Sequence, residues 1–229
     1  MRRVQPASSI FPTQSNYLNL RHREGARPLK WGRIALHLGG GLLAAALITE
    51  SATMSWQGFT FSFAGVLLVL DFLRFSVPKF NLGLVKRLEW FAQEHEANRL
   101  TSATWFWLAL SVVALAGDRS AYLATLVTLS VGDPAGSIVG RKVRSPTLVN
   151  GRTVGGTLAF FLAASLMVGV LFLRLPVDMS TMRLSLVVMG ASALGALIEL
   201  YTAKLDDNLT VGLGVGLVYV GCLPPVFAG

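Results

Sequence analysis

Long apolar stretches alternate with short polar ones along most of the chain. Seven can be delimited, at residues 34–50, 58–73, 103–117, 120–140, 154–175, 183–199 and 209–227. A helix needs about 20 apolar residues to cross a bilayer, so several of these stretches are short for a span. Backbone polar groups inside a bilayer must bond within the protein, which favours helices. The pattern therefore predicts an all-α, polytopic integral membrane protein with about seven transmembrane helices, six or eight being the alternatives.

Two segments depart from this pattern. Residues 79–99 carry apolar side chains at positions 80, 84, 88 and 91 with charges mostly elsewhere, which predicts an amphipathic interfacial helix. Residues 1–32 are basic and contain three prolines, so we expect a disordered cytoplasmic N-terminal tail, with an organellar transit peptide as the alternative. Residues 33–229 would form a single transmembrane domain.

Composition supports the membrane assignment. Hydrophobic residues make up 53% of the 229 positions and charged residues 14%, whereas soluble domains usually carry about 25% charged residues. The single cysteine, Cys222, rules out a disulfide within the chain and a thiolate metal cluster. We interpret it as a small apolar filler.

The net charge of +8 has two explanations, a nucleic-acid partner or an excess of cytoplasmic cations. Of the 20 Lys and Arg, 17 lie in the N-terminal tail and in alternate loops, and 3 lie in the remaining loops. The positive-inside rule predicts this alternation for an odd number of spans with a cytoplasmic N-terminus. We therefore expect no nucleic-acid partner, and we expect the polar segments near residues 133–152 and 205–208 to face the cytoplasm.

One apolar stretch ends in LSVGDPAGSIVGRK, residues 129–142. Its glycines recur every four residues and share one helix face: Gly132, Gly136 and Gly140. Such a face lets transmembrane helices pack closely, and it also lets phosphate oxygens approach the backbone. A phosphate site is favoured by the cations Arg141 and Lys142 and by Asp133, since a carboxylate at a membrane boundary is energetically costly and marks a functional candidate. Both interpretations stay open at this point.

A second motif, NGRTVGG at residues 150–156, opens the next apolar stretch. Backbone amides at a helix start form an anion site, and Gly151 and Thr153 belong to this turn. Arg152 adds a cation with bidentate phosphate geometry. The alternative is an ordinary basic loop followed by a glycine-rich helix start.

A third motif, IELYTAKLDDNLTVGLGVG, joins the last two apolar stretches. Glu199, Asp206 and Asp207 are hard oxygen ligands of the kind that Mg²⁺ uses together with substrate phosphates. Asn208 would contact a nucleotide or cap the following helix. A solvated acidic turn with a helix cap is the alternative interpretation.

Together the three motifs supply acids for Mg²⁺ and glycines and cations for phosphates, as phosphoryl transfer requires. The acceptor would be a lipid alcohol reaching the site from the bilayer. The chain has no Walker A motif, GxxxxGK[ST], so we exclude a P-loop enzyme. Among the three histidines, His37 is the one that lies inside a predicted span.

The motifs resemble those of the polyprenol kinase family, which includes dolichol, phytol and CTP-dependent diacylglycerol kinases and is distantly similar to phosphatidate cytidylyltransferases. VGDPAGSIVGRK is similar to the family's GDxxAxxxGxxxGxx element, NGRTVGGTLA to its GKSxEGSxA element, and LDDNLTVGLGVG to its DNLTVP-type element. RIALHLGGG, with Arg33 and His37, is similar to an early RxxxHxxxG element, and HEANRLTSATWFWLA, with Glu96, to the segment before the third span. The resemblance covers the chain from about residue 33 onward.

The resemblance implies a CTP-dependent kinase with Mg²⁺ as cofactor. It implies a metal or phosphate-site role for Asp133, a nucleotide platform of Gly132, Gly136 and Gly140, and phosphate contacts from Arg141, Lys142 and Arg152, with Asp207 and Asn208 completing the site. Two positions depart from the family: Arg152 replaces a Lys, and Gly155 replaces a Glu. The missing carboxylate implies a different acceptor, a compensating acid such as Glu96, or an inactive member.

We therefore predict transfer of the γ-phosphate of CTP to the hydroxyl of a membrane lipid alcohol, with Asp133, Asp207 and His37 as candidate catalytic residues. The alternatives are a cytidylyltransferase-like enzyme making a CDP-lipid and a non-catalytic membrane transporter or scaffold. A homodimer is a possible assembly. Asp71 and Arg74, three residues apart, should pair on one helix face. The host membrane would be a bacterial or archaeal inner membrane, or an endoplasmic reticulum or plastid membrane.

Overall fold

The computed structural model describes residues 31–51, 55–77, 99–203 and 205–224. The predicted amphipathic helix at 79–99, with Glu96, lies outside the described residues except for its last position, and the predicted tail does so except for residues 31 and 32. The described part is helical and contains no named strand, which confirms the all-α prediction. Its elements are α2 (Trp31–Ala35), η1 (Leu36–Gly40), α3 (Gly41–Glu50), α4 (Trp56–Ser76), α6 (Ser102–Ala114), α7 (Arg119–Lys142), η3 (Val149–Gly151), α8 (Val154–Phe172), α9 (Thr181–Tyr201) and α10 (Asp207–Cys222).

Within the described part of the chain, five helical segments are long and apolar enough to cross a membrane: Trp31–Glu50, Trp56–Ser76, Arg119–Lys142, Val154–Phe172 and Thr181–Tyr201. The remaining two apolar helices, α6 and α10, have 13 and 16 residues. At 1.5 Å per residue they are shorter than the hydrocarbon core of a bilayer. The helices occupy the apolar stretches expected from the sequence, and five of them have the dimensions of a span.

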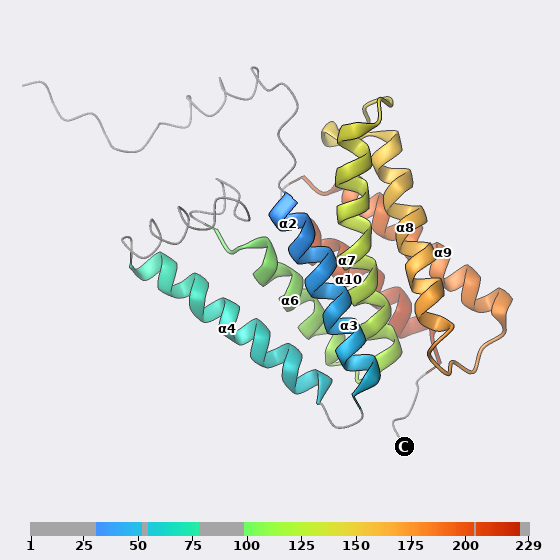
Figure 1. Cartoon of the computed structure of the whole chain (residues 1–229), viewed down its shortest axis with the longest axis horizontal. Coiled ribbons are helices and arrows are strands. Elements are labelled where there is room, and N and C mark those ends of the chain that lie inside the picture. The colour runs from blue at the N-terminus through green and yellow to red at the C-terminus, as the bar shows by residue number, and fades with distance from the viewer. Residues whose placement is uncertain (1–30, 52–54, 78–98, 204, 225–229) are drawn as a thin grey trace, which may run out of the picture.

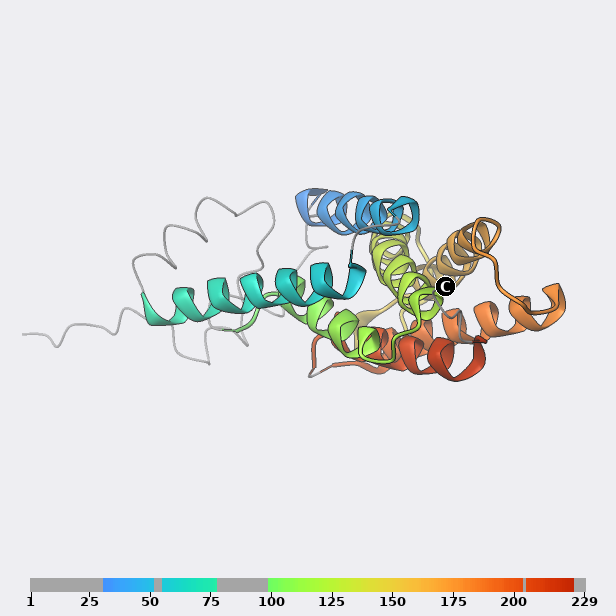
Figure 2. The same cartoon turned by 90° about the horizontal axis from the view of Figure 1, so that it is seen from below.

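Helix α7 forms the centre of the bundle (Figure 1). Every residue from Ser120 to Gly132 is buried, because α3, α6, α8 and α10 all pack against this helix. Figure 2 shows α7 between α3 on one side and α10 on the other. A helix that is enclosed on all sides needs no single apolar stripe. Two of its buried hydroxyls are satisfied within the helix, since Thr125 and Thr128 donate to the carbonyls of Ala121 and Ala124 at 2.8 Å.

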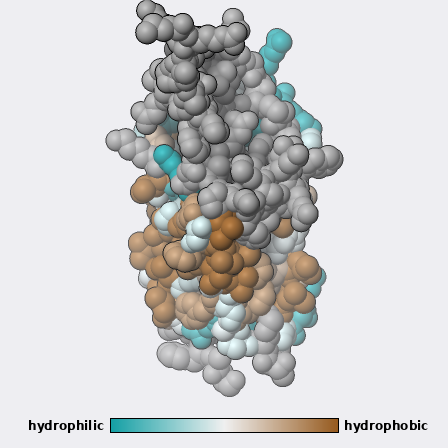
Figure 3. Space-filling model, turned by 90° about the vertical axis from the view of Figure 1, so that its left-hand side faces the viewer, coloured by the Kyte–Doolittle hydropathy of each residue, from teal (hydrophilic) through white to brown (hydrophobic). Residues whose placement is uncertain are grey.

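The outer helices present apolar side chains to their surroundings. On α4, Phe61, Phe63, Val66, Val69 and Phe72 are exposed. Figure 3, a view from the α4 side of Figure 1, shows hydrophobic surface gathered in a band across the middle of this face. Contiguous exposed apolar surface is typical of protein or lipid contact, and its place on helices long enough to span a bilayer is compatible with a lipid-facing surface.

The first helical segment runs antiparallel to α7. No Cβ fits at Gly41 because the side chain of Ser130 fills that space, and Arg119 donates to the carbonyl of Ile48 at the far end. At the near end, the ammonium of Lys142 lies 4.9 Å from the centre of the Trp31 ring. Between these contacts, η1 is a single π-helical turn that carries His37. Such turns occur mostly as single insertions within α-helices, frequently at functional sites.

Candidate active site

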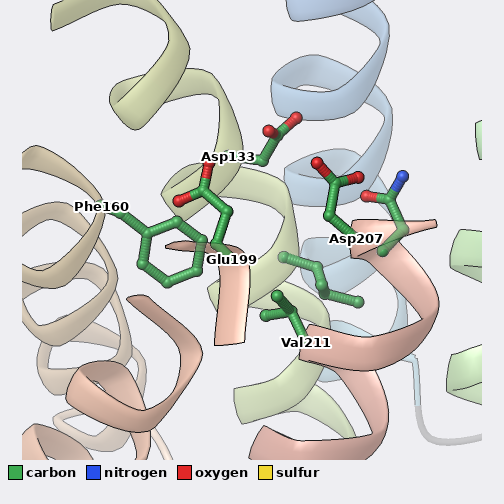
Figure 4. Close-up of a pocket in the computed structure, with 7 residues that line it drawn as sticks. Asp133, Phe160, Glu199, Asp207 and Val211 are labelled. Atoms are coloured by element: carbon green, nitrogen blue, oxygen red, sulfur yellow. The ribbon is translucent and has the colours of Figure 1, made fainter. Parts of the chain in front are cut away.

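Arg152 bridges two acids that belong to different helices. Its Nη1 lies 2.6 Å from Oε1 of Glu199, near the end of α9, and its Nη2 lies 2.8 Å from Oδ2 of Asp207, the first residue of α10. Figure 4 shows that Asp133 of α7 extends into the space above these two acids. The three predicted motifs therefore meet at one end of the bundle.

These side chains surround a small pocket between α7, α8, α9 and α10. Its lining residues are Leu129, Asp133, Phe160, Glu199, Asp207, Asn208 and Val211. The carboxylates form its polar rim, while Phe160 and Val211 close it on the apolar side (Figure 4). With a volume of about 10 Å³, the pocket has room for little more than a water molecule, and convergent charges surround that space.

Arg152 remains a cation in this setting. Its partial burial lowers the pKa of the guanidinium, but Glu199, Asp207 and Asp133 raise it, and the net effect is a pKa above the usual value. Three carboxylates therefore face one guanidinium, which leaves the cluster with an excess of negative charge. Such an excess favours binding of a further cation.

The Arg152 loop is fixed to the end of α9. Thr147 and Thr153 form an isolated antiparallel bridge, and the turn between them places Asn150 and Gly151 at φ of 57° and 75°. Asparagine and glycine tolerate this left-handed region better than other residues. The side-chain amide of Asn150 donates to the carbonyl of Leu200 at 3.1 Å. The loop backbone and the Arg152 side chain are thus both attached to the last turn of α9.

The acids at the start of α10 play different roles. Asp206 is the N-cap: its Oδ1 accepts from the backbone N and from Nδ2 of Asn208, both at 3.0 Å, and its Oδ2 accepts from Ser102 at 3.1 Å. Burial raises the pKa of Asp206 to about 6, and Asp207 adds to the rise, while these hydrogen bonds oppose it. The structure therefore places Asp206 as a helix cap, with Asn208 bound to it, and leaves Asp207 facing Arg152.

The amides at the start of α8 are occupied by hydroxyl groups of the same chain. Thr153 caps the helix by accepting from the amide of Gly156 at 3.2 Å, and Ser145 accepts from the amide of Gly155 at 3.0 Å. The anion site that the second motif predicted at this helix start is thus filled internally. A Cβ at Gly155 would lie 2.9 Å from Oγ of Ser145, so a carboxylate at this position would displace that side chain.

The glycine face of α7 lies against α8. A Cβ at Gly132 would lie 2.7 Å from the ring of Phe160, one at Gly136 would lie 3.3 Å from the carbonyl of Gly156, and one at Gly140 would lie 3.1 Å from Thr153. Helix packing, the alternative left open by the sequence, accounts for these three glycines. Gly136 also borders the Glu199 carboxylate, since its Cβ would lie 3.5 Å from Oε2.

Arg141 and Lys142 lie apart from the acidic cluster. Both are exposed at the end of α7, and eight residues separate Arg141 from Asp133, which is about 12 Å along a helix. Lys142 stacks over Trp31 instead. The structure therefore brings Arg152 to the three acids but leaves the other two cations at the rim of the bundle.

His37 does not line the pocket. It is buried in the π-helical turn, and its ring packs edge-to-face on Phe106 with centroids 5.3 Å apart. The antiparallel register of this segment with α7 puts His37 near the level of Asp133, on the side of the bundle that faces α6. The structure thus supports a packing role for this residue.

The predicted pair of Asp71 and Arg74 is confirmed as an ion pair within α4. Both are nearly fully buried, and Oδ2 of Asp71 also accepts from the backbone N of Thr101 at 2.9 Å and from Oγ1 of Thr104 at 2.6 Å. Since Ser102 in the same turn of α6 contacts Asp206, this network fixes the start of α6 beside the start of α10. The ion pair therefore helps to hold the start of α10, which carries Asp207, in place.

A metal ion is not held by protein ligands alone within the described residues, where no group of three His, Cys, Asp or Glu side chains is arranged for it. The donor set nevertheless fits Mg²⁺, because Asp133, Glu199 and Asp207 are hard oxygen ligands in one pocket. Mg²⁺ commonly takes one or two carboxylates and completes its shell with water and phosphate oxygens.

Residues that sequence reasoning did not single out include Asn150, Phe160 and Ser102. Asn150 stands inside the second motif beside a glycine, which is a turn signal, whereas Phe160 and Ser102 carry no signal in the linear sequence.

Comparison of the chain with family models, with curated proteins and with solved structures finds no match in any of the three.

Proposed function

We propose that the chain is a Mg²⁺-dependent membrane kinase that transfers the γ-phosphate of CTP to the hydroxyl of a lipid alcohol. The observation that carries the proposal is the meeting of Asp133, Glu199 and Asp207 around Arg152 at one end of an apolar helical bundle. Phosphoryl transfer depends mainly on positioning and charge neutralisation, and this cluster offers groups for both. The nucleotide and the acceptor class follow from the resemblance of the three motifs to polyprenol kinases.

The arrangement of the helices supports a site at the membrane surface. Asp133 lies toward the end of α7, Arg152 precedes α8, Glu199 lies near the end of α9 and Asp207 begins α10. In the proposed topology all seven apolar helical segments cross or enter the bilayer, and this end faces the cytoplasm, where CTP is found. A lipid alcohol would reach the pocket laterally, between helices whose outer faces are apolar.

Within this proposal the cluster holds the metal ion, binds the transferred phosphate and accepts a proton. Asp133 and Asp207 would hold Mg²⁺ with the phosphates of CTP, and the ion would neutralise their charge. Arg152 would bind an oxygen of the transferred group through its planar guanidinium. A carboxylate oxygen of Asp133 or Asp207 that does not contact the ion would accept the proton of the alcohol, because both side chains line the pocket.

The test is a transfer assay with the purified full chain in detergent, γ-labelled CTP, Mg²⁺ and a panel of lipid alcohols: polyprenol, phytol and diacylglycerol. We expect a labelled lipid phosphate and CDP. Release of pyrophosphate with phosphatidate would instead favour the cytidylyltransferase-like alternative. Absence of labelled product with every acceptor, together with absence of CTP binding, would reject the enzyme and favour a transporter or scaffold.

A further inference from the structure

The two ion pairs of Arg152 differ in their surroundings. Glu199, at 2.6 Å from Nη1, has a side chain that is 5% exposed, whereas Asp207, at 2.8 Å from Nη2, has one that is 24% exposed. Arg152 itself is 30% exposed. One acid is thus enclosed by the protein and the other is open to solvent, although both contact the same guanidinium.

Because its side chain is buried, Glu199 is held firmly to Arg152. The last turn of α9 places this carboxyl group beside Gly136 of α7, where little solvent reaches it. A buried charge that loses its partner is strongly destabilising. Since Asn150 also bonds the Arg152 loop to the carbonyl of Leu200, the loop, Arg152 and Glu199 are held together as one unit.

Asp207 is in a different position. It belongs to the first turn of another helix, α10, where the helix dipole stabilises its negative charge whichever cation it faces. Solvent reaches its side chain, so breaking the Asp207–Arg152 ion pair costs less free energy than breaking the Glu199–Arg152 pair. Asp207 also shares the pocket with Asp133, which makes a divalent cation an alternative partner.

We infer that Glu199 is a positioning residue that anchors Arg152, and that Asp207 is an exchangeable partner which passes from Arg152 to the divalent cation when the phosphate ligand binds. This inference rests on the proposed function. The exchange uncovers Nη2 of Arg152 for a phosphate oxygen, while Nη1 stays on Glu199. Cation binding and phosphate binding are therefore coupled through one guanidinium.

The first experiment measures CTP affinity by titration calorimetry, in EDTA and in Mg²⁺, for the wild type, Asp207→Asn and Glu199→Gln. The control is Asp178→Asn, which makes the same charge change on the exposed connection between α8 and α9. We expect Mg²⁺ to tighten wild-type binding about tenfold, equivalent to about 1.4 kcal/mol. Asp207→Asn should bind CTP about threefold or more tighter than the wild type in EDTA and gain little from Mg²⁺, because Arg152 is already uncovered.

Glu199→Gln should bind CTP about tenfold more weakly than the wild type in both buffers, since Arg152 loses its anchor. The control should match the wild type. If Asp207→Asn shows no gain in EDTA, or if Glu199→Gln behaves like Asp207→Asn, the assignment of anchor and exchangeable partner is overturned while the proposed function stands. If the wild type does not bind CTP with Mg²⁺, the proposed function fails and the exchange fails with it.

The second experiment needs no nucleotide. Double-mutant cycles on the thermal midpoint in detergent with EDTA pair Arg152→Gln with Glu199→Gln and with Asp207→Asn. We expect a larger departure from additivity, in degrees, for the Arg152–Glu199 cycle than for the Arg152–Asp207 cycle. Equal departures, or the reverse order, would overturn the assignment whatever the binding data show.

Discussion

Gly156 on α8 faces the backbone of Gly136 on α7 so closely that a Cβ at position 156 would lie 2.9 Å from the carbonyl oxygen of Gly136. The same Cβ would lie 3.2 Å from Cα of Gly140. Two helices therefore meet through bare backbone beside the acidic cluster. The close approach brings the start of α8, and with it Arg152, next to Asp133.

We predict that Gly156→Ala lowers the free energy of unfolding by about 1–3 kcal/mol, the range for overpacking in a tight interior. The closest neighbour of the new methyl group is a backbone atom, the carbonyl oxygen of Gly136 at 2.9 Å, so one helix must move even if the nearby Thr153 side chain gives way. The measurement is thermal or denaturant unfolding in detergent. The matched control is Gly169→Ala on the same helix, where a Cβ meets nothing within 4 Å and the change should stay within about 1 kcal/mol. Equal stability of the two variants would contradict the packing described for α7 and α8.

Asp71→Asn removes the charge that faces Arg74 in the buried pair of α4. We expect a loss of about 3–5 kcal/mol, the usual cost of breaking a buried ion pair from one side. The hydrogen bonds from Thr101 and Thr104 to Asp71 should weaken at the same time. Unfolding in detergent measures the loss, and Glu50→Gln, an exposed acid at the other end of the bundle, is the control. A loss no larger than that of the control would show that the pair is not buried in the protein.

The cap at Asp206 predicts a pH dependence of stability. Its pKa is about 6 in the folded chain, above the value of about 4 for an unfolded aspartate. Between these values the folded chain binds more protons than the unfolded chain, so this group lowers the free energy of unfolding as the pH rises from about 4 to 6.

Asp206→Asn keeps a good capping residue and removes the titration. Relative to this variant, the wild type should become less stable across that pH window and run parallel to it above pH about 6.5. Unfolding midpoints in EDTA at a series of pH values measure the difference. Parallel curves throughout would mean that Asp206 titrates normally in the folded chain.

Asp133→Asn should reduce phosphate transfer by about 100-fold or more, as expected for a charged group that acts on the transferred phosphate. The side chain is half-buried, and the ion pairs and hydrogen bonds described for the fold do not involve it, so the thermal midpoint should change little. Initial rates with γ-labelled CTP, measured beside Asp178→Asn, provide the check. Full turnover in the Asp133 variant would remove this residue from the site.

The sequence predicted the helices well, because long apolar runs leave a chain few options in or near a bilayer. It also predicted that acids from the first and third motifs would meet Arg152 from the second, since each motif lies at a connection on the same side of the bundle: the end of one apolar stretch or the start of the next. These features depend on where a residue lies along its own helix, and the sequence pattern predicts that position.

The linear pattern does not predict which side chains of different helices contact one another. The sequence could not show that Phe160 would fill the space beside Gly132 or that Ser145 would occupy the amide of Gly155. Arg141 and Lys142 seemed to belong with Asp133 because they follow it closely, yet about two helical turns separate them from it. Asp206 and Asp207 are neighbours in sequence, but one became a cap and the other a partner of Arg152, because helix α10 begins between them.

The π-helical turn at Leu36–Gly40 determines how α2 is rotated about the helix axis relative to α3. It holds one residue more than an α-helical turn, and one residue corresponds to about 100° of rotation around a helix axis. Deleting Gly39 or Gly40, whose Cβ positions meet nothing within 4 Å, would therefore turn Trp31 away from Lys142 while Gly41 stays on Ser130. The extra residue thus lets one continuous helix match two differently oriented surfaces of α7.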